Sequence, residues 1–552
     1  MAQHIARSSP SAPTFDRSPA STFPGWGSVA RLRLPMRMLL GAAMVLVFIL
    51  AGCGGGGNGN GQGGIHRGGT LNVGLDSDVV TLDPLKSSAL VDREVMLNLY
   101  DTLVRVDAKN NVQPDLATSW TFTTPTQLVF TLRSGVKFQD GTPFNADAVV
   151  FNINRILNTP SSPRFSELSS VQSVEKVDDL HVQFNLKSAF SPLLATLTDR
   201  AGMILSPTAV QAAGDNLASA PTKAGTGPFM FSSWVKGSKL TIVKNPNYWQ
   251  KDSSGGALPY LDQVVYHPIT DGSVMFSNLE TNTIQVAEDI NPTDIPSVKS
   301  NSSLVYKQIA GLSFNGIELN TQVAPFNNVH LRRAVAFAIN RQEILTSVLK
   351  GIGVLTEGPL SPSSWAYDSS LQPYSPTSDI ASAKQELTQG GSPNGFSFDL
   401  LIASGSPLTL QLAQFIQSEL QPAGITVNIK AETFATLLSD SAAHKFQAAA
   451  LSWSGRPDPD GNVYGWFHTG GGFNDMQYTN PQVDTLLDGA RQSSDQATRT
   501  NDYKQADQLI VQDAPYVFLY AGVAEQCSQK SVQNFQLLPT TIMVFTSTYL
   551  SA

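Results

Sequence analysis

The sequence predicts a mixed α/β protein built from several lobes. Its 552 residues are too many for one hydrophobic core, and two or three domains or lobes are expected at this length. From Gly68 onward, segments with alternating apolar residues are interspersed with segments whose apolar residues fall on one helical face. This part of the sequence shows no repeat and no long apolar span.

Three segments show the strand pattern clearly, with apolar side chains at every second position. Such alternation predicts strands that are buried on one face only. The segments and their apolar residues are 126–138 with Leu128, Phe130 and Leu132, 181–187 with Val182, Phe184 and Leu186, and 425–431 with Ile425, Val427 and Ile429.

Two segments predict helices, because their apolar residues recur at helical spacing. Asn145 is well placed to cap the first of these helices. In the second segment, Asn340 and Glu343 resemble a capping box that opens a further turn of helix, and Gly351 is a suitable stop. The apolar faces are Val149, Val150, Ile153, Ile156 and Leu157 within 143–157, and Leu331, Val335 and Ala338 within 329–353.

The composition argues against nucleic acid as a partner. The whole chain has 36 basic and 44 acidic residues and a net charge of −8. Residues 1–52 hold five Arg and one Asp, so the remainder carries a net charge of −12. Phosphate recognition depends on fields of Lys and Arg, which this balance does not provide. A charged content of only 14%, with abundant Gly, Ser, Thr, Asn and Gln, suits an extracytoplasmic protein.

Residues 1–52 predict an export signal preceded by a long prelude. Arg31, Arg33 and Arg37 come before the uncharged segment 38–51, which is too short to span a bilayer comfortably.

The residues around Cys53 resemble the bacterial lipobox, a Leu followed by two small residues and a Cys that receives a diacylglycerol. Here Leu50, Ala51 and Gly52 precede Cys53, and residues 54–64 contain only Gly, Asn and Gln. We therefore expect lipidation of Cys53 and a flexible tether behind it. The alternative is a plain membrane anchor with Cys53 incidental.

The two cysteines, Cys53 and Cys527, lie far apart in the sequence. They could form one bridge, but they make no disulfide framework and no CxxC metal spacing. We expect Cys527 to be a small buried hydrophobe. We expect no metal and no cofactor.

A set of segments in chain order carries a family resemblance. Any one of them is a weak signal, whereas the collinear set is specific. Together they resemble the family 5 solute-binding proteins of ABC transporters, the peptide and nickel binding group, over residues 68–525. The segments are GGTLNVGL at 68–75, TLDP at 81–84, YDTLVRVD at 100–107, QPDLATSW at 113–120, LRSGVKFQDGTPFNADAVVFNINRI at 132–156, GTGPFMFSSW at 225–234, KNPNYW at 244–249, APFNNVHLRRAVAFAINRQEI at 324–344, SWSGRPDPDG at 452–461, QYTNPQVDTLLDGAR at 477–491 and DAPYVFLY at 513–520.

The resemblance implies a periplasmic-binding-protein-like clamshell of two lobes with an additional inserted domain, the large cluster C type. Solute would enter the cleft between the lobes, which close by hinge motion because the ligand contacts both of them. The expected parts are the signal peptide and prelude 1–52, the lipidated Cys and tether 53–64, the first lobe 65–104, 223–320 and 524–552, the inserted domain 105–222, and the second lobe 321–523.

The implied function is that of a lipid-anchored receptor of an ABC importer. It would capture di- or oligopeptides and deliver them to an ABC permease complex in the membrane, without enzymatic activity. We expect a monomer on the outer face of the cytoplasmic membrane.

The resemblance also implies which residues contact the solute. Family members hold an extended peptide through main-chain hydrogen bonds, much like β-augmentation. An aspartate a few residues after a tryptophan pairs with the peptide's ammonium group. One edge of the site matches Ser88, Ala89, Leu90 and Val91, and the other matches Trp453, Ser454 and Gly455, with Trp453 as a flat apolar wall.

This chain departs from the family pattern at the aspartate. Arg456 occupies the matching position, and Asp458 and Asp460 follow in a loop that is shorter by one residue. Either Asp458 binds the ammonium, or the ligand presents none and Arg456 favours a carboxylate, phosphate or hydroxyl-rich ligand. An ion pair between Arg456 and Asp458 within the loop is the structural alternative.

Other functions are weaker alternatives. The same fold could bind an oligosaccharide, a nickel chelate or another small organic solute, although the cleft loops hold no His cluster. A secreted hydrolase would need a catalytic motif, and the sequence has no GxSxG, no HExxH and no Cys beside a His. We expect Asp458 and Asp460 to be solvated rather than a catalytic pair. A surface sensor or chaperone without a permease also remains open.

One glycine motif and two tryptophans have structural explanations. The glycines of GTGPF lack the GxxxxGK pattern of a phosphate loop and predict a turn. Trp120 and Trp249 are expected to seal a core.

Overall fold

The computed structural model describes residues 65–551. The predicted signal, lipobox and tether lie outside these residues. No helix between 65 and 551 is both long enough and apolar enough to cross a membrane.

The first of the three main sheets has seven strands. Its strands follow the order β12-β18-β11-β1-β10-β9-β8. β1 runs parallel to both β10 and β11, so the carboxyl ends of these three strands lie at the same edge. The strands are β1 (Thr70–Leu75), β8 (Phe229–Val235), β9 (Lys239–Lys244), β10 (Gln263–Pro268), β11 (Val286–Ala287), β12 (Leu304–Ala310) and β18 (Val523–Gln529).

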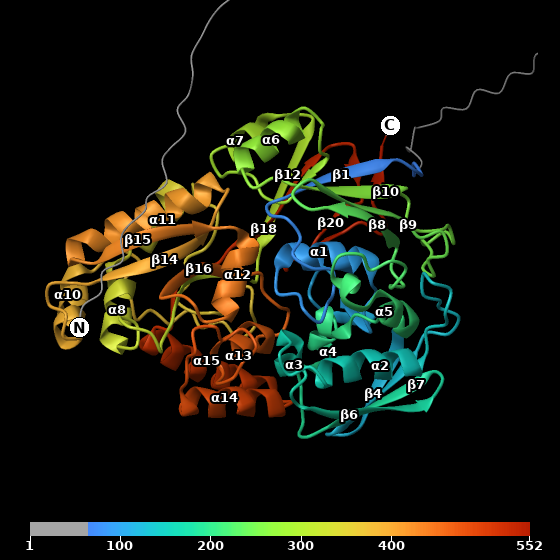
Figure 1. Ribbon diagram of the computed structural model, residues 1–552, viewed down its shortest axis with the longest axis horizontal. Helices are drawn as coiled ribbons and strands as arrows, with labels where there is room; N and C mark the ends of the chain where they lie inside the picture. The colour runs from blue at the N-terminus through green and yellow to red at the C-terminus, as the bar shows by residue number, and fades with distance from the viewer. Residues whose placement is uncertain (1–64, 552) are drawn as a thin grey trace, which may run out of the picture. The chain divides into compact units, whose positions relative to one another are not determined.

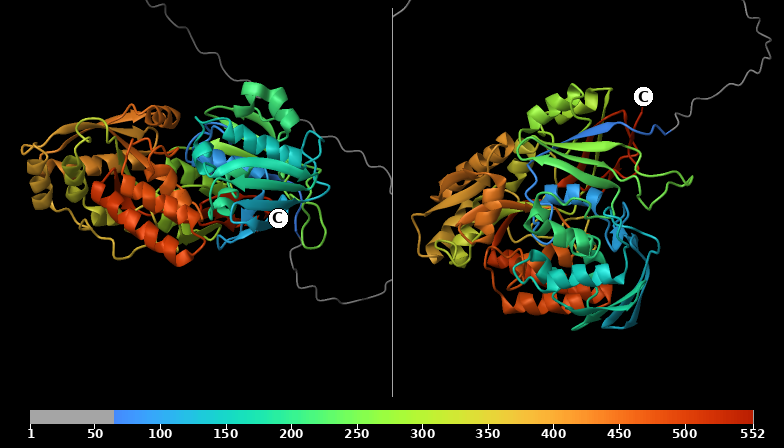
Figure 2. Two further views of the ribbon diagram at one scale, coloured as in Figure 1. Left: turned by 90° about the horizontal axis from the view of Figure 1, so that it is seen from below. Right: turned by 45° about the vertical axis from the view of Figure 1, so that its right-hand side comes forward.

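Both faces of this sheet are covered. α1 (Leu90–Leu99) and α5 (Pro207–Ala213) share a core with β1 and β9 on one face. α6 (Gly272–Glu280) and α7 (Ile295–Ser300) pack with β11 and β12 on the other. The C-terminal tail, red in Figures 1 and 2, returns beside β1, where Leu550 contacts Gly69.

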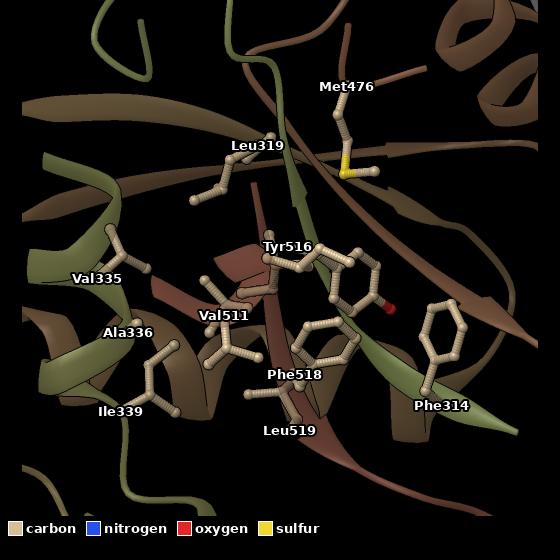
Figure 3. Close-up of a cluster of buried hydrophobic side chains, with 14 of the residues drawn as sticks. Phe314, Leu319, Val335, Ala336, Ile339, Met476, Val511, Tyr516, Phe518 and Leu519 are labelled. Atoms are coloured by element: carbon tan, nitrogen blue, oxygen red, sulfur yellow. The ribbon is translucent and has the colours of Figure 1, made fainter. Parts of the chain in front are cut away.

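A five-stranded sheet, in the order β15-β14-β16-β13-β17, carries the second large core. Helices α8, α10, α11 and α13–α15 bury this core, and Figure 3 shows part of it around Phe314 and Phe518. The strands are β13 (Phe314–Leu319), β14 (Ser397–Ala403), β15 (Thr426–Glu432), β16 (Ala448–Trp453) and β17 (Tyr516–Tyr520). The helices are α8 (Val329–Ala338), α10 (Ile380–Gln389), α11 (Pro407–Leu420), α12 (Phe434–Ala442), α13 (Asp460–Phe467), α14 (Pro481–Gln492) and α15 (Gln496–Asp513).

A four-stranded antiparallel sheet, in the order β4-β5-β7-β6, forms a third core with α2. Short helices α3 and α4 follow α2 and the sheet along the chain. The elements are β4 (Ala117–Thr124), β5 (Gln127–Leu132), α2 (Ala146–Leu157), α3 (Pro163–Glu167), β6 (Val171–Asp178), β7 (His181–Leu186) and α4 (Leu193–Thr196). Two-stranded pairs β2 (Val104–Val106) with β3 (Val112–Pro114), β19 (Val532–Gln533) with β22 (Tyr549–Leu550), and β20 (Gln536–Leu537) with β21 (Met543–Val544) complete the strands.

The local sequence patterns predicted these elements well. β5 and β7 bury every second residue, as the alternation indicates. β15 buries Val427, and Ile425 just before it is also fully buried. α2 begins after Asn145, whose side chain accepts a hydrogen bond from the Ala148 amide. These three strand predictions and the cap are confirmed.

The second predicted helix is interrupted. α8 ends at Ala338, and α9 (Arg341–Glu343) leads into a short π-helical turn over Ile344–Val348. The Asn340 side chain caps α9 by accepting a hydrogen bond from the Glu343 amide. The Glu343 carboxylate accepts from the Asn340 side chain and not from the Asn340 backbone amide, as a full capping box requires. The box is therefore half formed, while Gly351 at a φ of 85° ends the segment as predicted.

The other structural expectations also hold. Gly225 and Gly227 lie so close to the Leu99 backbone that a Cβ atom would come within 2.0 and 2.6 Å of its carbonyl oxygen, so GTGPF is a close-packed turn. Trp120 and Trp249 pack against the third core. Cys527 is a buried free thiol, 1% exposed.

Candidate functional site

The candidate site is a buried group of charges where three distant segments meet. Arg93 comes from α1, Asp199 and Arg200 follow α4, and Arg456 lies in the loop after β16. Asp199 is the common partner: its carboxylate lies 3.0 Å from Arg93, 3.0 Å from Arg456 and 3.4 Å from Arg200. The loop of the five-stranded sheet is thereby joined to α1 and to the segment after α4.

Positive charge dominates this group. Burial alone would raise the pKa of Asp199, but the surrounding arginines, with Arg456 and Arg93 foremost, hold it well below its usual value of 3.8. Arg164 on α3 adds another guanidinium that is fully buried. Among residues 65–551, Nη2 of Arg456 has no hydrogen-bond acceptor, and the one ion pair of Arg164 is with Glu167, 3.2 Å from its Nη2. The site therefore retains unused donors for an anionic or polar group.

Asn462 holds the loop after β16 in shape. Its side-chain oxygen accepts from the Trp453 indole at 3.0 Å and from the Arg456 amide at 2.6 Å, and its nitrogen donates to the Arg456 carbonyl. Gly455 has a φ of 84°, and a Cβ there would come within 2.5 Å of the Leu312 backbone. The backbone is thus fixed by contacts that only Gly and Asn supply here.

The predicted apolar wall is covered in this structure. Trp453 is 4% exposed, its ring packs against Trp466 and Phe473, and the Arg456 guanidinium lies 4.1 Å from the ring centroid. Such a stacked cation both shields the ring and orients the guanidinium. Contact between Trp453 and a solute stays a prediction.

The two acidic residues of the loop are anchored rather than solvated. Asp458 lies 2.6 Å from Arg499, and Asp460 lies 2.7 Å from Arg491. The expectation of solvated carboxylates was wrong, because both arginines come from distant helices that the loop sequence does not reveal. The alternative of an ion pair between Arg456 and Asp458 is also not realised, since each has another partner.

The other predicted edge lies directly before and within α1. Ala89 and Val91 are buried, whereas Ser88 and Leu90 are partly exposed. Arg200 donates to the Ala89 carbonyl at 3.2 Å and to the Ser87 hydroxyl at 3.0 Å. The structure therefore brings this edge close to the charged group that also contains Arg456.

A small cavity lies beside these charges. It has a volume of about 30 Å³ and is lined by residues of α3, α4, the loop after β16 and α13, including Asp199, Arg456 and Asp458. This volume holds about one or two water molecules. Between residues 65 and 551, no three or more His, Cys, Asp or Glu side chains are arranged to hold a metal ion.

Sequence reasoning missed Arg93, Asp199, Arg200 and Arg164. One signal was present, because Arg93 lies in a run of three charged residues within a helix that is otherwise apolar except for Asn98, and all three are buried. Nothing in the local sequence indicates that Asp199 faces Arg456.

The comparisons with known proteins decide the family. The sequence model of "Bacterial extracellular solute-binding proteins, family 5 Middle" matches residues 111–474. This chain belongs to that family. The family 5 solute-binding proteins are extracytoplasmic and serve ABC importers as binding components rather than enzymes.

Two curated relatives of this family 5 protein are similar over most of their length. The glutathione-binding protein GsiB of Pectobacterium atrosepticum is 28% identical over 86% of this chain and 92% of its own. The probable D,D-dipeptide-binding periplasmic protein DdpA of Escherichia coli is 29% identical over 86% of this chain and 93% of its own.

Two solved structures show the fold of this family 5 chain. DppA from Helicobacter pylori in complex with the peptide STSA gives a TM-score of 0.81 at 28% identity, covering 88% of this chain and 99% of DppA. AppA from Bacillus subtilis in complex with a nonapeptide gives 0.81 at 26% identity, covering 88% and 100%. The expected periplasmic-binding-protein-like fold with multiple domains is confirmed.

Proposed function

We propose that this protein is the peptide-capturing receptor of an ABC importer, held on the outer face of the cytoplasmic membrane by a lipid on Cys53. The observation that carries the proposal is the full-length similarity to two binding proteins whose solved structures contain peptides. The bound solute would lie between the lobe that contains α1 and the lobe that contains β16. We keep the domain limits at 104/105, 222/223, 320/321 and 523/524 as part of this proposal.

The roles of Arg456 and Asp458 follow from their free atoms. The Asp458 carboxylate accepts two hydrogen bonds from residues 65–551, and both go to Oδ1. Its Oδ2 atom is therefore left for a peptide ammonium. Arg456 has one buried nitrogen, Nη2, without an acceptor, and this atom would receive a carboxylate oxygen of the solute. The remaining contacts would be main-chain hydrogen bonds along residues 88–91 and 453–455.

A non-peptide anion is the second candidate, and the excess of arginine around Asp199 is what favours it. Glutathione, the named solute of one relative, is itself a peptide with two carboxylates, so an anionic peptide would also fit this excess of arginine.

Mass spectrometry of small molecules released from the purified protein separates the two candidates. Recovery of peptides, followed by calorimetric titration of the stripped protein with the same peptides, is the expected result. Exclusive recovery of a non-peptide solute would overturn the peptide assignment. Free and N-acetylated forms of one peptide test Asp458: acetylation should weaken binding about tenfold or more, since a charge-assisted hydrogen bond is lost.

The lipid anchor has its own test. Cys53→Ala should move the protein from the membrane fraction to the soluble fraction, because the acyl chains attach only to that thiol. Cys527→Ala is the matched control and should leave fractionation unchanged. Retention of Cys53→Ala in the membrane fraction would show that segment 38–51 anchors the protein itself.

A further inference from the structure

A second group of charges, all acidic, lies at the edge of the seven-stranded sheet. Asp76 follows the carboxyl end of β1, and Glu288 and Asp289 follow the carboxyl end of the parallel neighbour β11. Glu94 reaches the same place from α1. In open α/β sheets, ligands bind in the crevice at the carboxyl ends of parallel strands. We call these four residues the acidic group.

The acidic group runs from an exposed mouth to a buried floor. Asp76 and Asp289 are exposed, Glu288 is partly buried, and Glu94 is 0% exposed. The Asp76 amide donates to Glu288 Oε2 at 2.9 Å, which ties the two strand ends together. Both carboxylate oxygens of Glu94, and Oε1 of Glu288, are buried and accept no hydrogen bond from an amide, hydroxyl or cationic donor of residues 65–551, and the two carboxyl groups lie within hydrogen-bonding reach of each other.

A neutral side chain at the same floor is also unpartnered. Tyr266 on β10 is 1% exposed, and its hydroxyl forms no close hydrogen bond within the described chain, although the Asn98 side chain lies beside it. Burial raises the pKa of this hydroxyl, and the nearby charge of Glu94 raises it further. A buried hydroxyl and a buried carboxylate beside each other, both without partners, point to a group that is supplied from outside.

Within residues 65–551 these carboxylates form no direct ion pair, and the one nearby cation that lowers the pKa of Glu94 is Arg93. No ion pair in the described part of the chain includes Asp76, Glu94, Glu288 or Asp289. The neighbouring Arg93 directs its guanidinium to Asp199 and to the Thr540 carbonyl instead. Burial, and then the charges of the other carboxylates, raise the pKa of Glu94 and of Glu288. A buried carboxylate without a partner is costly, and a cation from the ligand would remove that cost.

The acidic group faces the other lobe. Burial raises the pKa of Tyr520 at the end of β17, and the charge of Asp289 raises it further, so the end of the five-stranded sheet is near the mouth. Phe434 and Leu438 of α12 pack against the core beneath α1. Gly405, in the loop after β14, approaches Thr270 after β10 so closely that a Cβ atom at Gly405 would lie 2.8 Å from the Thr270 hydroxyl. A group bound here would touch both lobes, as closure requires.

We propose that the acidic group, with the Tyr266 hydroxyl, binds an ammonium or guanidinium group of the solute, so that this receptor selects peptides carrying a positive charge. This inference rests on the proposed function and names the substrate class within it. The carboxylates are not arranged to hold a metal ion, whereas an organic cation with several N–H donors spans a wider set of acceptors. Because the amino terminus of the peptide is assigned to Asp458 above, the cation expected at the acidic group is a lysine or arginine side chain.

Calorimetric titration of the purified protein with matched tripeptides tests the inference. Ala-Lys-Ala and Ala-norleucine-Ala have side chains of similar length, and only the first is charged. N-acetylated forms of both remove the terminal ammonium and so separate its binding at Asp458 from binding of the lysine side chain at the acidic group. We expect at least about a tenfold preference for Ala-Lys-Ala over Ala-norleucine-Ala, with and without acetylation.

The variant Glu94→Gln should reduce that preference to near unity. Glu280→Gln, an exposed residue at the far end of α6, is the matched control and should keep the preference. If Glu94→Gln does not fold, Asp76→Asn at the exposed mouth serves instead and should lower the preference severalfold. The peptide comparison with the unmodified protein requires no variant at all.

The possible failures are distinguishable. Binding of charged and neutral peptides with equal affinity would overturn the acidic site, would indicate that Glu94 and Glu288 share a proton instead, and would leave the peptide function intact. A preference that survives in Glu94→Gln would place the cation elsewhere and also overturn the inference. If none of the four peptides binds, the proposed peptide function fails and the inference fails with it.

Discussion

Replacing Asp199 with asparagine removes the one carboxylate that lies within 3.4 Å of three buried arginines, namely Arg93, Arg200 and Arg456. The amide keeps the shape of the side chain but carries no charge. The guanidinium groups of Arg93 and Arg456 are almost fully buried, with 1% and 8% of their side chains exposed. They would then repel each other in a medium that screens charge poorly.

The expected loss of stability is about 3–5 kcal/mol, the range observed when one partner of a buried ion pair is removed. Urea unfolding followed by circular dichroism measures it. Asp147→Asn is the matched control, because Asp147 pairs with Lys176 at 2.8 Å on the surface. Solvent screens that pair, so its loss should change stability far less.

A second substitution tests the reason for the loss. Arg456→Met in the Asp199→Asn background removes one of the unpaired cations, so the double variant should be more stable than Asp199→Asn alone. The difference from the unmodified protein should also depend on pH. Because the pKa of Asp199 is lowered in the folded state, its contribution is complete above the ordinary pKa of 3.8 and is lost as pH falls below it. A loss below about 1 kcal/mol at pH 7, or no recovery in the double variant, would refute this account of the charged group.

Two further predictions concern burial and backbone contacts. Burial raises the pKa of Glu357 to about 7 from 4.5, and its Oε2 atom has no donor among residues 65–551. Glu357→Gln should therefore match the stability of the unmodified protein at pH 4 and become increasingly more stable than it between pH 4.5 and 7. Urea midpoints that differ by a constant amount across this range would contradict the burial argument. Gly227→Ala should destabilise the protein by about 1–3 kcal/mol in thermal unfolding, because the new Cβ would lie 2.6 Å from the Leu99 carbonyl. The new Cβ of Gly489→Ala within α14 would meet only the flexible end of Asp502 at 3.3 Å, so this substitution should be neutral or stabilising. Equal effects of the two substitutions would contradict the steric explanation.

The parts of the fold that depend on short-range rules could be predicted from the sequence. Asn145 caps α2 because its acceptor needs only an amide three residues ahead. β5 and β7 follow the alternation because one face of each strand is buried. The capping-box pattern at Asn340 likewise indicated the new helix that begins there. The π-helical turn over Ile344–Val348 escaped prediction, because the apolar spacing gives no sign of it.

The candidate site could be predicted only in outline. Family resemblance pointed to the loop after Trp453 and to residues 88–91, and the structure brings both close to the same charged group. It could not supply the partners, because Asp199 and Arg499 are far from that loop in the sequence and meet it only through tertiary packing. The run Asp92, Arg93 and Glu94 in the largely apolar helix α1 was the one local sign of the charged group.

That run of charges in α1 explains how two opposite charged groups arise so close together. Asp92 turns inward to accept from the Val80 and Thr81 amides, which fixes the loop after β1. Arg93 and Glu94 then point to different sides, since successive residues of a helix are about 100° apart, and reach Asp199 and the acidic group respectively. A peptide lying along α1 would thus place its carboxylate near the arginines and a cationic side chain near Glu94. Its anion must join or displace Asp199 at Arg456, so affinity for the carboxylate should be modest and selectivity should come chiefly from the acidic end.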